Sequence, residues 1–159
     1  MKIEVNISRQ QMVLLDDSGS LLRSYSVSTA LNGPGEEEGS NCTPRGQHRI
    51  RAKIGSDQPV NAVFVRRRPT GEVYTPQLGE QFPERDWILT RILWLCGCEP
   101  GYNRLGSCDT MQRYIYIHGT TAERGVGVPR SHGCINMLNE DLLELFELVK
   151  VGTVVNIIV

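Results

Sequence analysis

The sequence predicts a mainly β domain, arranged as a β-sandwich or barrel, with one helix before the last strand. Three observations support this fold class: short runs of alternating apolar and polar residues recur, loops rich in Gly and Pro separate them, and one segment near the C-terminus has a helical period. The chain has 159 residues, 40% of them hydrophobic, which is enough for one domain with its own core. Because neither a repeat nor a linker divides it, we expect residues 1–159 to form a single domain.

Alternating runs in the first half of the chain predict a series of strands. The runs at 11–15 and 21–28 are joined by "DDSGS", which has the composition of a hairpin loop. Residues 31–44, "LNGPGEEEGSNCTP", combine Gly, Pro and acidic residues and therefore predict a loop. The strands expected in this half are residues 2–7, 11–15, 21–28, 47–55 and 61–68.

The second half of the chain is less regular. Residues 87–95, "WILTRILWL", form a longer apolar segment, and periodicity does not decide between strand and helix for it. Residues 99–110 predict a second long loop, whereas "QRYIYIHG" at 112–119 is β-branched and aromatic and predicts a strand. "TVVNIIV" at 153–159 closes the chain as a further strand.

One helix is expected just before this last strand. Asn139 is a candidate N-cap, and Glu140 and Asp141 would lie in the first turn, where acidic side chains suit the helix dipole. Lys150 suits the last turn, and Gly152 suits a left-handed stop. The apolar face of this helix has the i, i+3, i+4, i+7 spacing of Leu142, Leu145, Phe146 and Val149.

Composition argues against several classes of protein. A net charge of −1 lacks the basic excess of a nucleic-acid-binding domain, so we expect no nucleic-acid partner. The most apolar stretch is interrupted by Thr90 and Arg91 and is shorter than a membrane span, so we expect no membrane partner. The N-terminus alternates polar and apolar residues and shows no export signal, which predicts a cytoplasmic protein if Met1 is the native start and a periplasmic one if the sequence is truncated. The cysteines are odd in number, which fits reduced thiols better than a disulfide framework.

The stretch that carries chemistry is "SHGCINM", in which Cys134 follows a His-Gly pair. A thiol attacks as the thiolate, and a free cysteine with a pKa of ~8.5 is mostly protonated at neutral pH. His118, in "IYIHGT", ends the strand expected at 112–119 and is the candidate base that takes this proton and leaves an ion pair. The loop from Gly119 to Ser131 contains Gly and Pro and can bring Cys134 back against His118, so the sequence predicts a cysteine nucleophile.

The residues around Cys134 are of the types that acyl transfer needs. Gly133 allows a sharp turn, so the amides of Gly133 and Cys134 can point at one spot and hold an oxyanion. We expect His132 to add a donor or orient substrate, Asn136 to bind a substrate amide or carboxylate, and Ser131 to anchor the turn.

Two other interpretations compete with catalysis. Taken alone, Cys134 fits a buried thiol and His118 fits a hydrogen-bonded core histidine. A zinc site would need cysteines in tight pairs, and the spacing here does not match, so we expect no metal. The cysteines expected to serve only as packing or loop thiols are Cys42, Cys96, Cys98 and Cys108.

"IHGT" followed by "SHGCINM" resembles the signature of the L,D-transpeptidase catalytic domain family, the YkuD-like family. The likeness extends to "STALNGPGEEEGSNCTPRGQHRI", "GYNRLGSCDTMQRYIYIHGT" and "NEDLLELFELVKVGTVVNIIV", and so covers nearly the whole chain. The resemblance implies a β-sandwich of the L,D-transpeptidase catalytic-domain type, with one C-terminal helix before the last strand. It also implies a cysteine acyl transferase that uses no cofactor.

The same resemblance implies roles for individual residues. Cys134 would be the nucleophile, His118 the base, and the backbone carbonyl of Gly119 the group that orients the imidazole. The substrate would be a peptidoglycan stem tetrapeptide, cleaved before its terminal D-alanine through a thioester, and carbapenem-type inhibitors would acylate Cys134. The positions that shape the acyl pocket would be His132, Gly133 and Asn136.

Stem peptides carry carboxylates, so cationic side chains near the signature are candidate substrate contacts. Arg130 directly precedes the signature and is the candidate in the predicted site. The other arginines of this region and of the strand at 61–68 are expected to be mainly exposed: Arg66, Arg67, Arg68, Arg113 and Arg124.

The acceptor decides which reaction the thioester undergoes. With no export signal visible, water is the expected acceptor, which would make the enzyme an L,D-carboxypeptidase of murein recycling. Two alternatives stay open: an L,D-transpeptidase that forms cross-links or exchanges D-amino acids, and an inactive module that only binds wall peptides. An intact pair of His118 and Cys134 argues against the inactive module.

Overall fold

The computed structural model describes residues 1–159 and is mainly β. Its strands are β1 (Lys2–Asn6), β2 (Gln11–Leu15), β3 (Leu21–Ser28), β4 (Gly46–Ile54), β5 (Ala62–Val65), β6 (Arg68–Val73), β7 (Ile88–Gly97), β8 (Tyr116–Thr120), β9 (Ile135–Leu138) and β10 (Val154–Ile158). Its helical segments are α1 (Pro76–Gln81), the 3-10 turn η1 (Gly106–Cys108) and α2 (Asn139–Leu148). The prediction of a mainly β domain with one main helix before the last strand is confirmed.

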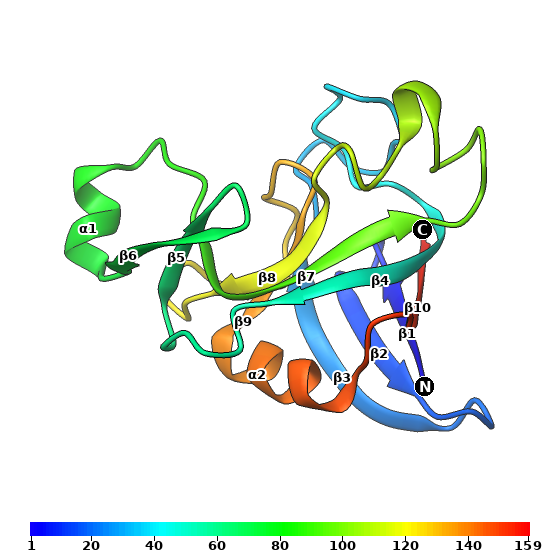
Figure 1. Cartoon of the computed structure of the whole chain (residues 1–159), viewed down its shortest axis with the longest axis horizontal. Helices are drawn as coiled ribbons and strands as arrows, with labels where there is room; N and C mark the ends of the chain where they lie inside the picture. The colour runs from blue at the N-terminus through cyan, green and yellow to red at the C-terminus, as the bar shows by residue number, and fades with distance from the viewer.

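The strands form one continuous hydrogen-bonded sheet that closes on itself. Its order is β4-β10-β1-β2-β3-β9-β8-β7-β5-β6, and β7 pairs with β4 as well, which completes a ring. The two layers of the predicted sandwich are therefore joined at both edges. The β5–β6 hairpin and α1 lie outside the ring and extend from it on one side, as Figure 1 shows.

The hydrophobic core fills the inside of this ring. It contains 20 buried residues, most of them from the strands and from α2, which packs against β7, β8 and β9. The helix buries Leu142, Leu145 and Phe146, as its periodicity predicts. Because the core faces one side of β8 and β9, their other side is left for the functional residues.

Two strand predictions needed correction. Residues 61–68 do not form one strand, because the chain turns back between β5 and β6 at Arg66 and Arg67, whose φ angles are 51° and 65°. Left-handed residues at both central positions suit the twist of a tight hairpin. The strand expected at 112–119 begins only at Tyr116, since Tyr114 has a φ of 58° and interrupts it. The ambiguous segment at 87–95 is a strand, β7.

The ends of α2 differ from the prediction. Asn139 is not an N-cap: Leu138 occupies that position, and the Asn139 side chain accepts a hydrogen bond from Thr90 Oγ1 at 2.7 Å and donates one to Asn61 Oδ1 at 2.6 Å. Asn139 therefore ties the helix to β7 and to the start of β5. Lys150 lies beyond the last turn, and it is Lys53 of β4 that donates to the carbonyls of Phe146 and Val149 at the helix end.

The short helix α1 was missed, although the sequence carries a signal for it. Thr75 is its N-cap and accepts a hydrogen bond from the Leu78 amide, and Pro76 takes the first position. Thr followed by Pro is a typical helix start.

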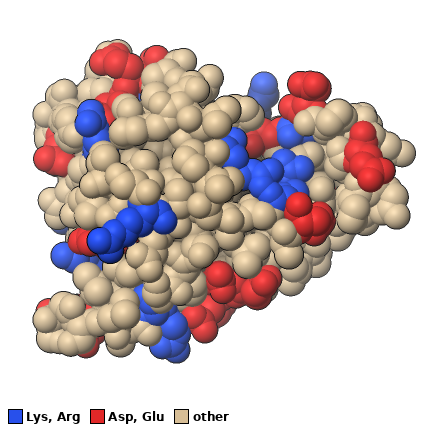
Figure 2. All heavy atoms as spheres, turned by 180° about the vertical axis from the view of Figure 1, so that it is seen from behind, with Lys and Arg blue, Asp and Glu red and all other residues tan.

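Charged side chains of both signs are mixed over the face of the molecule that Figure 2 shows. Figure 2 shows cationic and acidic groups interspersed, with one cationic group gathered beside acidic ones toward the end that carries α1. Neither helix has the length and apolar character that crossing a membrane requires.

Candidate active site

The two motif residues lie on neighbouring strands and on the same face of the sheet. Strands β8 and β9 are parallel, with Ile117 opposite Ile135 and His118 opposite Asn136. Ile117 and Ile135 are fully buried in the core. Because side chains alternate along a strand, His118 and Asn136 point to the opposite side, and Cys134, one residue before Ile135, points with them.

Cys134 faces a cavity of about 420 Å³. Its Sγ accepts a hydrogen bond from the Tyr116 amide at 3.3 Å and lies 3.5 Å from the Tyr114 carbonyl, to which the thiol donates. Cys134 is therefore partly buried but borders the cavity. The residues that line this cavity, called here the thiol cavity, are Arg66, Arg67, Asp86, Ile88, Arg113, Tyr114, Ile115, Tyr116, Ser131, His132 and Cys134.

His118 is buried and held in one tautomer. Its Nδ1 lies 3.0 Å from the carbonyl oxygen of Gly119, so Nδ1 carries the proton and Nε2 is the free acceptor. Nε2 is buried and has no hydrogen-bond partner in the protein. The carbonyl of Gly119 is thus placed as the resemblance implied, and the imidazole presents an unused base on the face that Cys134 shares.

Burial favours the neutral form of both groups at neutral pH. Burial, with a smaller contribution from the negative charge of Asp86, raises the pKa of Cys134 to about 12. Burial lowers the pKa of His118, and Asp86 offsets this only in part. The sequence led us to expect a thiolate–imidazolium pair, whereas burial favours the neutral thiol of Cys134 and the neutral imidazole of His118, because neither charge is well solvated there.

The turn before Cys134 is tightly braced. Gly133 has a φ of 133°, and a Cβ on it would approach the side chain of Ile115 and the carbonyl of Cys42. Ser131 Oγ donates to the carbonyl of Cys134 and accepts from the Gly133 amide at 3.2 Å. Ser131 therefore anchors the turn, as the sequence predicted.

This bracing changes the expectation for the oxyanion donors. The Gly133 amide is occupied by Ser131 Oγ, whereas the Cys134 amide forms no hydrogen bond within the protein. The Cys134 amide is accordingly the donor that is free to face a negative oxygen.

Sequence reasoning missed Thr43, which also supports this turn, through a hydrogen bond to Gly133. Its Oγ1 donates to the carbonyl of Gly133 at 2.9 Å and accepts from the Ala30 amide at 2.9 Å, and the side chain is fully buried. The Thr-Pro pair was visible in the sequence, but nothing there linked it to Gly133.

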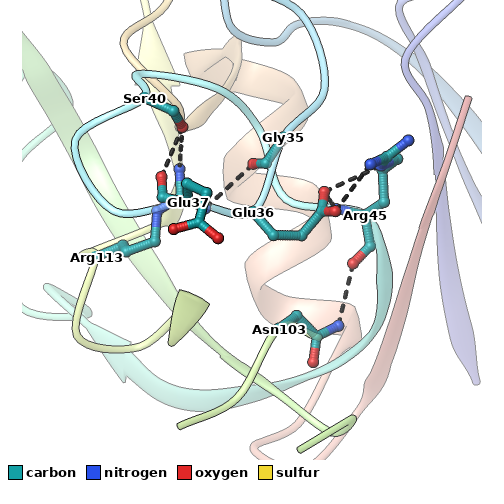
Figure 3. A network of polar contacts seen from close by, with 7 residues as sticks. All are labelled: Gly35, Glu36, Glu37, Ser40, Arg45, Asn103 and Arg113. Atoms are coloured by element: carbon teal, nitrogen blue, oxygen red, sulfur yellow. Dashed lines mark hydrogen bonds and ion pairs between the residues drawn. The ribbon is translucent and has the colours of Figure 1, made fainter. Parts of the chain in front are cut away.

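Arg113 holds the loop that carries Thr43 and is not the exposed residue we expected. Its guanidinium donates to the carbonyl of Gly35 and to Ser40 Oγ (Figure 3). It also donates to the carbonyl of Cys42 at 2.8 Å. In the same network Glu36 accepts two hydrogen bonds from the Arg45 side chain, at 3.0 and 2.8 Å. The loop at 31–44 is therefore clamped beside the nucleophile turn.

Arg67 also differs from the exposed edge expected at 66–68. Its guanidinium lies 4.8 Å from the ring centre of Trp94 and 4.7 Å from that of Tyr114, and it donates to the hydroxyl of Tyr116 at 3.0 Å. These contacts make Arg67 a fixed part of the cavity wall. Arg66, which also lines the thiol cavity, has no ion-pair or hydrogen-bond partner.

A smaller pocket of about 190 Å³ lies beside the thiol cavity. Ser131 and His132 line both spaces, whereas the predicted contacts Asn136 and Arg130 line only the smaller one. The site predicted from the sequence is thus divided between two adjoining spaces. The residues of the smaller pocket, called here the arginine pocket, are Pro83, Glu84, Arg85, Asp86, Trp87, Arg124, Arg130, Ser131, His132 and Asn136.

The structure offers no cluster of three ligands that could hold a metal ion. All five cysteines are free thiols, and no three His, Cys, Asp or Glu side chains come together as ligands.

Comparison with known proteins agrees with this geometry. The chain matches the YkuD family model, described as the L,D-transpeptidase catalytic domain, over residues 1–157. The probable L,D-transpeptidase YbiS of Escherichia coli K12 is 34% identical over 110 residues, which are 67% of this chain and 35% of that protein. The chain thus spans about a third, 35%, of the length of that curated relative.

Solved structures share the fold. An L,D-transpeptidase from Mycobacterium smegmatis matches with a TM-score of 0.57 and 19% identity, over 99% of this chain and 58% of that one. L,D-transpeptidase 3 from Mycobacterium tuberculosis, in complex with a faropenem-derived adduct, matches with a TM-score of 0.58 and 15% identity, over 99% of this chain and 59% of that one. At these identities the likeness is one of fold.

Proposed function

The chain belongs to the L,D-transpeptidase catalytic domain family, and from this we propose that it is a cysteine acyl transferase acting on peptidoglycan stem tetrapeptides, with water as the favoured acceptor. The observation that carries the proposal is the unpartnered Nε2 of His118, buried on the face that Cys134 shares. A buried acceptor without a partner is unfavourable in a folded protein, so its retention on the face of the sheet that also carries Cys134 points to use as a base.

Acylation begins with the neutral pair. As Sγ of Cys134 attacks the carbonyl carbon of the third stem residue, Nε2 of His118 takes the thiol proton. The carbonyl oxygen becomes an oxyanion, which the Cys134 amide can receive. When the intermediate collapses, the C–N bond to the terminal D-alanine breaks, and the His118 imidazolium gives its proton to the departing amine.

Deacylation uses the same base in the second half of the reaction. The neutral imidazole takes a proton from water as the water oxygen attacks the thioester, and the C–S bond breaks to give a tripeptide and a thiol. The sum of the two steps is L,D-carboxypeptidase activity.

The sizes of the two spaces support a small acceptor. The thiol cavity, at about 420 Å³, is large enough for part of a peptide, and Arg66 there is a cation without a partner for a stem carboxylate. The arginine pocket, at about 190 Å³, is below the range typical of larger ligands. Water or a single amino acid fits this space better than a second stem peptide does.

Mass spectrometry of the products tests the proposal. Purified protein is incubated with a free tetrapeptide, with and without an added amine, and Cys134→Ala is the control. If the unaltered protein releases tripeptide and D-alanine and Cys134→Ala does not, the result supports hydrolysis through Cys134. Only exchanged or cross-linked products would contradict water as acceptor, and equal turnover by Cys134→Ala would contradict the thioester.

Carbapenem-type inhibitors give a second check. The faropenem-derived adduct belongs to the Mycobacterium tuberculosis protein, and on the proposed mechanism such β-lactams also acylate Cys134 here. Intact mass should rise by one inhibitor in the unaltered protein and not in Cys134→Ala.

A further inference from the structure

Cys96 and Cys98 are a pair of thiols that the proposed reaction does not use. Cys96 lies in β7, and Cys98 directly follows Gly97, the last residue of that strand. The Cys98 amide donates to the carbonyl of Gln47 at 2.9 Å, so the chain stays paired with β4 through this residue. Because side chains alternate along an extended chain, Cys96 and Cys98 point to the same side of the sheet, opposite to the buried Leu95.

The two sulfurs differ from the other three in the chain because they have no hydrogen-bond partner. Cys42, Cys108 and Cys134 each donate to a backbone carbonyl, over distances of 3.3 to 3.6 Å. Cys96 and Cys98 form no such bond, and both are half-buried and not core residues. The sequence led us to expect packing thiols here, whereas both thiols border solvent and are free to bind a ligand from it.

The surroundings of the pair are cationic. Burial raises the pKa of Cys96, the negative charge of a Cys98 thiolate raises it further, and the positive charges of Arg51 and Arg104 lower it. The two thiols are therefore close enough to repel each other as thiolates. Arg49 lies directly opposite Cys96 in the β4–β7 register. None of these three arginines has a carboxylate partner.

The spacing of the pair favours a bridging ion over a disulfide. Residues two apart in a strand have Cα atoms about 6.5 Å apart, which is near the upper end of the range of about 4.4–6.8 Å that a disulfide spans. Their side chains stand side by side, whereas a disulfide brings its sulfurs to about 2.05 Å. Two metal–thiolate bonds of about 2.3 Å on opposite sides of an ion leave the sulfurs about 4.6 Å apart, which requires less movement of the strand.

The number of ligands selects the class of ion. No three His, Cys, Asp or Glu side chains come together, so an ion such as Zn²⁺, which takes four ligands in structural sites, finds too few of them. Soft thiolate ligands favour Cu(I), a soft monovalent ion for which two thiolates in a linear arrangement are sufficient.

We propose that Cys96 and Cys98 bind one Cu(I) ion between their sulfurs. Two S–H bonds are replaced by two Cu–S bonds, two protons are released, and no atom changes its oxidation state. The complex has one net negative charge, which Arg51 and Arg104 offset. The site lies beyond the part of β7 that pairs with β8, and it does not depend on the proposed function.

Competition with a chelator tests this site. The reduced protein is titrated with Cu(I) in the absence of oxygen, with bicinchoninate as the coloured competitor. We expect the unaltered protein to retain one equivalent of Cu(I), and Cys96→Ser and Cys98→Ser each to lower the affinity at least about a hundredfold, because only one thiolate remains. The matched control removes two hydrogen-bonded thiols, in the double variant Cys42→Ser, Cys108→Ser, and should leave the affinity unchanged.

X-ray absorption of the loaded, unaltered protein tests the same site without relying on the folding of any variant. Two sulfur neighbours around the copper support the proposal, whereas three or more sulfurs, or nitrogen neighbours, would overturn it. It is also wrong if the unaltered protein retains no Cu(I), or if the double variant Cys96→Ser, Cys98→Ser retains as much as the unaltered protein. An equal loss of affinity in the control would show that the copper is held by other thiols, and would likewise overturn it.

Discussion

The molecule contains two buried histidines with nearly the same surroundings, and they differ at one nitrogen. Nδ1 of His48 lies 3.0 Å from the carbonyl of Gly46, and Nδ1 of His118 lies 3.0 Å from that of Gly119. Burial lowers the pKa of both, that of His48 to about 4. Nε2 of His48 bonds to Thr110 Oγ1 at 2.9 Å, whereas Nε2 of His118 has no partner.

We infer that this one difference separates a structural histidine from a functional one. A histidine whose two nitrogens are both bonded has no free acceptor for a substrate proton at neutral pH, so His48 is expected to serve only to join β4 to the segment at Thr110. A histidine with one unused acceptor beside a thiol can take a proton when the thiol attacks. Each prediction below tests whether the two histidines separate in this way.

The largest effect is expected from exchanging each histidine for glutamine. His118→Gln should lower kcat/KM for tetrapeptide cleavage about 10²- to 10⁴-fold, because a general base is lost, with little change in stability. His48→Gln should leave kcat/KM unchanged. Steady-state kinetics with denaturant unfolding of both variants gives the comparison, and equal losses of activity would contradict the division of roles.

The second effect is a loss of stability in acid. The unfolded chain binds a proton on His48 below about pH 6.5, whereas the folded chain does so only near pH 4, so stability falls as the pH decreases through this window. The loss from His48 should reach about 3 kcal/mol, and the lowered pKa of His118 acts in the same direction.

His48→Gln separates this contribution from that of the carboxylates. Unfolding free energies measured from pH 7 to pH 4 should decline less steeply for His48→Gln than for the unaltered protein. Parallel curves would show that His48 does not titrate as its burial implies.

Only part of the candidate site could be predicted from the sequence. Cys134 and His118 lie in short motifs next to regular strands, so their roles could be predicted from residues close in the sequence. Thr43 supports Gly133 across 90 positions of chain, and a contact of that range leaves no periodic pattern. His48 and His118 could not be told apart by alternation, since both occupy strand positions.

The same holds for the fold: local features could be predicted from the sequence, and non-local ones could not. Alternation predicted most strands and the apolar face of α2, because these are local periodicities. The closing contact between β4 and β7 and the arginine turn at residues 66–67 were not predicted, because the first is non-local and the second has neither Gly nor Asn to mark it.

A third, smaller effect distinguishes the hydroxyls that support the two regions. Thr43→Val and Thr110→Val each remove one buried hydroxyl and should each cost about 1–3 kcal/mol in stability. Only Thr43→Val should also lower kcat, about tenfold or more, because the Gly133 carbonyl loses its donor and the nucleophile turn shifts. A fall in kcat for Thr110→Val of the same size would show that loss of packing alone explains the effect.

The smallest effect is expected where an ion-pair mechanism predicts a large one. If His118 held Cys134 as a thiolate at rest, His118→Gln would raise the thiol pKa and slow labelling by an alkylating reagent at neutral pH. Burial raises the pKa of Cys134 to about 12 and lowers that of His118, so the resting thiol is already protonated and the exchange should change the labelling rate little. Site-resolved mass spectrometry of alkylation from pH 6 to pH 10 measures this rate for Cys134 apart from the other four thiols. If Cys134 is labelled well below pH 8 and this labelling is lost in His118→Gln, the result supports the ion-pair mechanism. A rate that rises steadily with pH and does not depend on residue 118 would place the action of His118 in the transition state, since the same exchange should remove nearly all turnover.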